Sequence, residues 1–177
     1  MEFQNKSSRF QLITFYFVSL TIILSGCFSY SFSGGNIPEG VNFIYIPYFS
    51  DKTNSGQAAL SDQLYQSLNN QFINQSRLQL SSDENNADVS LTGAILTYKN
   101  SPFSISGEEI TTENRVEIIV KAIYKYKTES KAVFDKTFNG FANYSTVSDP
   151  VNGEQTAIAE ALSQISRKMF DDAVGQW

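Results

Sequence analysis

One stretch of this chain constrains its fold more than any other: residues 115–127 alternate between two kinds of side chain with a period of two. The side chains on one parity are apolar: Val116, Ile118, Val120, Ala122, Tyr124 and Tyr126. The other parity is mostly charged and includes Arg115, Glu117, Lys121, Lys125 and Lys127. Such a strand belongs to an antiparallel sheet that is covered on one face and solvated on the other.

Shorter strand signals lie on either side of this stretch. Residues 43–49 form an apolar run, and Pro47 predicts that this strand lies at an edge or ends near the proline. A second short strand is expected over 77–80. Alternation resumes after Asp88, and the last strand is expected over 132–141. Residues 100–112, which contain Pro102 and Gly107, are predicted to form a loop.

Two segments have helical periodicity. Over 58–75, four apolar residues recur at a spacing of four: Leu60, Leu64, Leu68 and Phe72. Asn54 or Ser55 is the expected cap of this helix. A second apolar stripe follows near the C-terminus: Ile158, Ala161, Leu162, Ile165, Met169, Phe170 and Val174. Asn152 is its expected cap, with Gln155 completing a capping box.

The order of these elements predicts the fold class. It is an α+β fold, a two-layer sandwich of one mostly antiparallel sheet of about four to five strands with two helices on one face. Residues 41–177 form a single domain of this kind, which is long enough to build a core.

The N-terminal 26 residues are predicted to be a signal peptide. Basic residues are followed by an apolar run too short for a comfortable membrane span, and the run ends in Leu24-Ser25-Gly26-Cys27. This ending matches a bacterial lipobox, in which the cysteine thiol receives a diacylglyceryl group and becomes the new N-terminus. Cys27 is the only cysteine, so an intrachain disulfide is excluded. We expect removal of residues 1–26 and a lipidated tether over 27–40.

Composition narrows the function. The net charge is −5, which argues against a nucleic-acid partner. There is no histidine, and lipid would occupy the single thiol, so the usual general base, thiol nucleophile and transition-metal ligands are missing. The carboxylate pairs Glu108-Glu109 and Asp171-Asp172 do not converge and are interpreted as surface charge. No enzyme, catalytic residue, metal site or cofactor is predicted.

The charged parity of the central strand is a candidate contact for anionic lipid. Arg115, Lys121, Lys125 and Lys127 would share one face, with Lys99 on the neighbouring strand. Phosphorylated lipid would be attracted to such a patch, less strongly at high salt. The alternative is a solvated strand face whose lysines protect a sheet edge.

Short motifs along the mature chain resemble the LptE-type lipopolysaccharide-assembly lipoproteins, most closely the Bacteroidetes branch. The matching segments are Cys27 through Gly34, Ile37-Pro38, Tyr48-Phe49, Leu91-Thr92-Gly93, Tyr98, Ser101-Pro102, Asn114-Arg115, Phe138, Phe141, Tyr144, Met169-Phe170, Val174 and Trp177. The likeness implies a fold of two helices on one sheet, in agreement with the periodicity. The basic phosphate-contacting residues credited to proteobacterial members have no evident counterpart in this acidic chain.

The resemblance implies an outer-membrane lipoprotein that binds a β-barrel lipopolysaccharide translocon of the LptD type, with lipopolysaccharide itself a possible ligand. Two alternatives stay open. One is a lipoprotein that activates a peptidoglycan synthase or serves a secretion channel, and the other is a lipid-binding lipoprotein. No acidic run follows Ser29, so the expected location is the outer membrane, lipid-anchored and facing the periplasm.

Overall fold

The computed structural model describes residues 37–103, 112–148 and 150–175, all of which belong to one compact unit, residues 33–177. Their elements follow one another along the chain: β1 (Phe43–Tyr45), β2 (Ser50–Asp51), α2 (Leu60–Asn74), β3 (Gln79–Ser81), a 3-10 turn (Glu84–Asn86), β4 (Val89–Pro102), β5 (Glu113–Tyr126), β6 (Phe134–Ser145) and α3 (Pro150–Val174).

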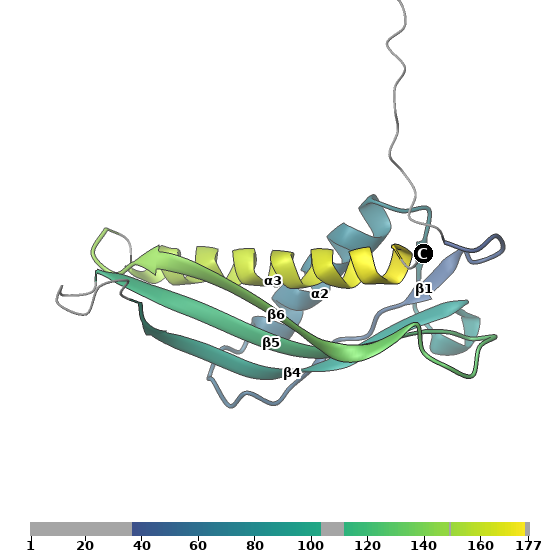
Figure 1. Cartoon of the computed structure of the whole chain (residues 1–177), viewed down its shortest axis with the longest axis horizontal. Helices are drawn as coiled ribbons and strands as arrows, with labels where there is room; N and C mark the ends of the chain where they lie inside the picture. The colour runs from purple at the N-terminus through teal and green to yellow at the C-terminus, as the bar shows by residue number, and fades with distance from the viewer. Residues whose placement is uncertain (1–36, 104–111, 149, 176–177) are drawn as a thin grey trace, which may run out of the picture. The chain divides into compact units, whose positions relative to one another are not determined.

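Three long strands form the main part of the sheet (Figure 1). β5 pairs with β4 on one side and with β6 on the other, and both pairings are antiparallel. The alternation seen in the sequence is realised along β5: its even-numbered residues from Val116 to Tyr126 are buried. An irregularity between Ile95 and Thr97 shifts the β4–β5 register by one residue. The bulge therefore switches the inward-facing positions of β4 from odd-numbered residues up to Ile95 to even-numbered residues from Tyr98 onward, which lie opposite buried residues of β5.

The other edge of the sheet is built from short parallel strands. β1 lies between β3 and β4, and β2 pairs with β4 further along. β1 ends before Pro47, which confirms the expectation that this strand ends near the proline. The other expectation, an edge strand, is wrong. The Asp88 carboxylate stabilises the start of β1 by accepting hydrogen bonds from the backbone amides of Asn42 and Phe43 at 2.8 and 2.9 Å.

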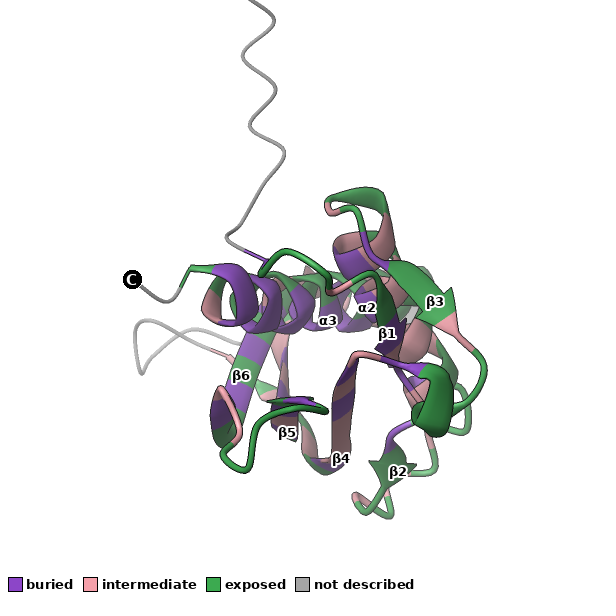
Figure 2. Ribbon diagram, turned by 90° about the vertical axis from the view of Figure 1, so that its right-hand side faces the viewer, coloured by how far each residue is buried: buried purple, intermediate pink, exposed green. Residues whose placement is uncertain are grey.

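Both helices cover the same face of the sheet, as Figure 2 shows, which confirms the predicted α+β sandwich. The two predicted apolar stripes are the buried ones. The predicted caps are wrong. α2 begins after Ala59 without a side-chain cap, and Asn54 instead adopts a positive φ of 53° in the preceding turn. α3 begins at Pro150, so Asn152 lies within its first turn. Proline suits a first helical position because its missing N–H would have no intrahelical partner.

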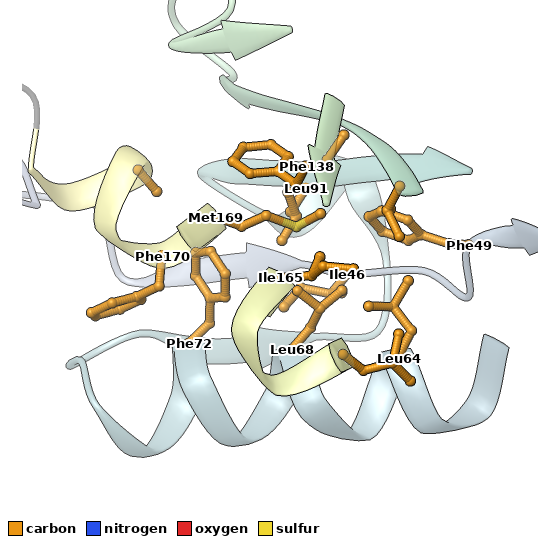
Figure 3. Packing of buried hydrophobic residues seen from close by; sticks show 14 of the residues in the cluster. Ile46, Phe49, Leu64, Leu68, Phe72, Leu91, Phe138, Ile165, Met169 and Phe170 are labelled. Carbon is orange, nitrogen blue, oxygen red and sulfur yellow. The ribbon is translucent and has the colours of Figure 1, made fainter. Parts of the chain in front are cut away.

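The core lies between the two helices and the sheet (Figure 3). Phe72 of α2 meets the Phe170 ring edge-on, with centroids 5.3 Å apart. Two glycines permit close approach on the covered face. A Cβ at Gly140 would lie 2.1 Å from the Ala161 carbonyl oxygen of α3. A Cβ at Gly93 would lie 2.5 Å from the Phe49 ring. Tight packing here requires the smallest residue.

Two of the long strands continue beyond their predicted ends. β4 continues through Asn100 to Pro102, and β6 runs on to Ser145 rather than ending at Phe141. Polar residues at the far ends of β4, β5 and β6 are held together by side chains, because Asn100 and Asn114 both donate to the Tyr144 hydroxyl. Pairing across the sheet thus extends strands that local composition reads as loop.

The edge of β6 is covered by α3. Gln164 donates to the Phe141 carbonyl at 2.9 Å and accepts from the Phe141 amide at 3.3 Å. Lys168 donates to the Asn139 carbonyl at 2.7 Å. These side chains occupy backbone groups that another strand would otherwise pair with, which blocks edge-to-edge association.

Candidate functional site

The candidate site is the uncovered face of the sheet, on the side away from both helices. Its residues come from alternate positions of three paired strands. Register sets Arg115 of β5 beside Ser101 of β4 and Asn143 of β6, and it sets Lys121 beside Ala94 and Thr137. We call this surface the open face.

Arg115 is the most firmly positioned cation of the open face. Its guanidinium carbon lies 3.6 Å from the centroid of the Phe103 ring and 4.8 Å from that of Phe141. Its Nε donates to Asn143 Oδ1 at 2.9 Å. Stacking on aromatic faces and one fixed hydrogen bond restrict the side chain before any ligand arrives. The remaining guanidinium N–H groups have the planar arrangement that suits phosphate or carboxylate oxygens.

The three predicted lysines differ from one another. Lys121 forms an ion pair with Asp135 at 3.1 Å, with both side chains about half exposed, so the pair contributes little to stability. Lys127 lies just past the end of β5 and donates to the Asn85 carbonyl at 2.5 Å. Lys125 and Lys127 both line a shallow hollow of about 180 Å³ next to Ser90, which Glu84 also borders. The predicted shared face is therefore real along β5, but the four cations do not form one cluster.

Three contacts of Arg115 were not among the predicted site residues: Phe103, Phe141 and Asn143. Phe141 was expected as the end of a strand and as part of the family resemblance, and it is 45% exposed on the open face. The alternation along β5 is visible in the sequence, but the register that brings residue 141 close to residue 115 is not. Cys27 and the tether to residue 36 lie outside the described residues.

A second polar cluster lies under the start of α3. The Tyr98 hydroxyl donates to the Glu154 carboxylate, which also accepts from Gln57 Nε2 at 3.2 Å. Burial, together with the bond to Glu154, raises the pKa of Tyr98 above its ordinary value. The hydroxyl therefore stays protonated, and the cluster ties β4, α3 and the turn before α2 together. We interpret it as structural.

Residues 37–103, 112–148 and 150–175 contain no group of three or more histidine, cysteine or acidic residues arranged to hold a metal ion. Within the same ranges, no helix has the length and apolar character required to cross a membrane.

Solved structures with TM-scores of 0.50 or more share the small α+β fold of this domain. A Xanthomonas campestris protein matches with a TM-score of 0.54 at 14% identity, covering 77% of this chain and 86% of its own. A Caulobacter crescentus protein described as a lipoprotein matches at 0.50 and 11% identity, covering 75% and 88%. A minor lipoprotein of Acinetobacter baumannii scores 0.49 at 17% identity, covering 78% and 94%. No curated protein matches the sequence.

The particular family follows from the sequence. The family model for LptE, described as lipopolysaccharide-assembly, matches residues 41–174, and this chain belongs to that family. Membership confirms the resemblance noted from the motifs and implies a role in lipopolysaccharide assembly. The family consists of non-enzymatic assembly lipoproteins of the outer membrane.

Proposed function

We propose that this chain is an outer-membrane lipoprotein, acylated on Cys27 and facing the periplasm, that binds an LptD-type β-barrel translocon and assists lipopolysaccharide assembly by contact rather than catalysis. The family match over residues 41–174 carries the proposal. A tether from residue 28 to residue 40 spans at most about 45 Å when fully extended, so the domain stays close to the membrane.

Lipid attachment has a direct test. Metabolic labelling with an alkyne-bearing fatty acid should mark the full chain, and Cys27→Ala should abolish the label because the chain has no other cysteine. Label that persists in the Cys27→Ala variant would exclude this attachment site.

The translocon role is tested by depletion in the host. The barrel should become misassembled and surface lipopolysaccharide should fall, because the proposed partner would lose its lipoprotein. Failure of peptidoglycan synthesis before any change in the barrel would support the synthase-activator alternative instead.

We further propose that the open face contacts the phosphates of lipopolysaccharide, with Arg115 as the principal contact and Lys121, Lys125 and Lys127 as weaker ones. The support is the restricted geometry of Arg115, since a guanidinium held by two rings and Asn143 loses little freedom on binding. Lys121 and Lys127 are weaker candidates because each already has a partner within the protein: Lys121 in an ion pair and Lys127 in a hydrogen bond.

A matched pair of arginine variants tests this contact. Arg115→Gln should weaken binding to lipopolysaccharide in detergent by about tenfold, which corresponds to about 1.4 kcal/mol. Arg167→Gln removes the same charge from the exposed side of α3 and should leave binding nearly unchanged. Equal losses in the two variants would mean that only net charge matters, and unchanged binding in both would leave the solvated-face alternative.

A further inference from the structure

The solvent-facing surface of α2 carries almost no charge. No acidic or basic residue occurs from Gln63 to Ser76, although 18% of the whole chain is charged. The side chains exposed along this stretch are instead amides and hydroxyls, among them Gln66, Asn70 and Asn74. The neighbouring helix differs, because α3 exposes Glu160, Arg167 and Asp171.

The amide side chains of α2 are arranged before any partner arrives. Asn74 donates to Asn70 at 3.3 Å, and Gln71 and Gln75 bond to each other one turn apart. Side chains that are already fixed lose less conformational entropy on binding. Between α2 and α3 lies a groove of about 300 Å³. Residues of both helices line it: Gln63, Gln66, Ser67, Asn70 and Gln71 of α2, and Ala159, Leu162 and Ser163 of α3.

An exposed aromatic side chain borders this surface. The Tyr48 ring stacks on Tyr65 of α2, with centroids 4.4 Å apart and an interplanar angle of 26°. Tyr48 is nonetheless 61% exposed. Tyrosines with rigid, accessible rings are enriched where proteins bind one another.

Charge decides what kind of partner fits this surface. Burying charged side chains costs free energy unless each is paired, and interface centres are accordingly depleted of lysine and acidic residues. The 15 residues of α2 form a helix about 22 Å long, which is longer than the contact surface of a single sugar. From these features we infer that the uncharged surface of α2, with Tyr48 at its border, is the face that packs against a folded protein with an equally uncharged polar surface.

The inference rests on the proposed function, which supplies such a partner. The interior wall of an outer-membrane barrel is polar, so an uncharged amide surface can hydrogen-bond to it without burying an unpaired charge. The helix surface would then hold the protein partner, and the open face of the sheet would remain available to lipid.

A charge-insertion experiment tests this assignment. In the double variant Gln66→Lys and Asn70→Glu the net charge stays constant and the helix is preserved. Gln66 donates to Asp62 in the wild type, and a lysine at position 66 can form an ion pair with the same carboxylate. A glutamate at position 70 can still accept the hydrogen bond that Asn74 donates to Asn70. The matched control Arg167→Glu and Asp171→Lys exchanges two charges already present on α3.

The measurement is capture of the barrel, identified by mass spectrometry, with tagged full-length protein in mild detergent. We expect at least a tenfold loss for the α2 variant and no loss for the α3 control, with equal melting temperatures. Equal capture by both variants would overturn the α2 assignment and leave the translocon proposal standing. No capture by the unaltered protein would overturn the translocon proposal and this inference together. Loss of binding to delipidated core oligosaccharide, with capture retained, would assign the surface to sugar instead.

Discussion

The two faces of the sheet come from the same strands and are held together in different ways. The covered face is apolar and packed, with Ile118, Val120 and Tyr124 fully buried beneath α3 and α2. The open face is held by contacts between side chains of neighbouring strands, such as Lys121 with Asp135. The covered face therefore supplies most of the free energy of folding, and the open face can change its side chains at small cost.

The strongest test of this contrast uses two adjacent residues of β6. Gly140→Val should prevent folding or destabilise by about 4 kcal/mol or more, because its Cβ would meet the Ala161 carbonyl oxygen at 2.1 Å. Asn139→Val, one residue away on the open face, should change the free energy of unfolding by less than about 0.5 kcal/mol. Urea denaturation followed by circular dichroism measures both, and a stable Gly140→Val variant would show that α3 can shift.

A second adjacent pair lies on β5. Ile118→Ala should cost about 2–5 kcal/mol, since the side chain is completely buried and its removal leaves a cavity. Ile119→Ala, on the partly exposed open face, should cost less than about 1 kcal/mol. Similar urea midpoints for the two variants would contradict the conclusion that the covered face supplies most of the free energy of folding.

The border between the faces is tested at the β6 edge. Gln164→Leu should cost about 1–2 kcal/mol, because it removes two hydrogen bonds to the backbone of Phe141. It should also increase self-association in size-exclusion chromatography, since the exposed backbone groups become free to pair. A destabilised variant that stays monomeric would show that α3 blocks this edge by its bulk alone.

The smallest expected effect concerns pH. Two backbone amides, from Asn42 and Phe43, hold the pKa of Asp88 below its ordinary value, while burial partly opposes them. Its contribution to stability is therefore complete above the unfolded-state pKa of about 3.9 and disappears as pH falls through the lower folded-state value. The difference in urea midpoint between the wild type and Asp88→Asn should be visible at pH 7 and shrink below pH 4. A difference that is constant down to pH 2 would exclude this linkage.

Local sequence patterns were sufficient to predict much of this fold. Period-two alternation determined the central strand and its buried parity, and four-residue spacing determined which side of α2 faces the core, because both follow from backbone geometry alone. The α+β class and the family resemblance followed from the order and content of these segments. The lipidation of Cys27 stays a prediction from its lipobox.

Tertiary structure decided the rest. The caps were mispredicted because helix starts depend on the turn before them, as the positive φ of Asn54 shows. Strand pairing extended β4 and β6 into polar sequence, and only register brought Phe141 and Asn143 to Arg115. The sequence determined which cations share a face, but their neighbours, and hence which cation is held rigidly, depend on contacts between residues far apart in the chain.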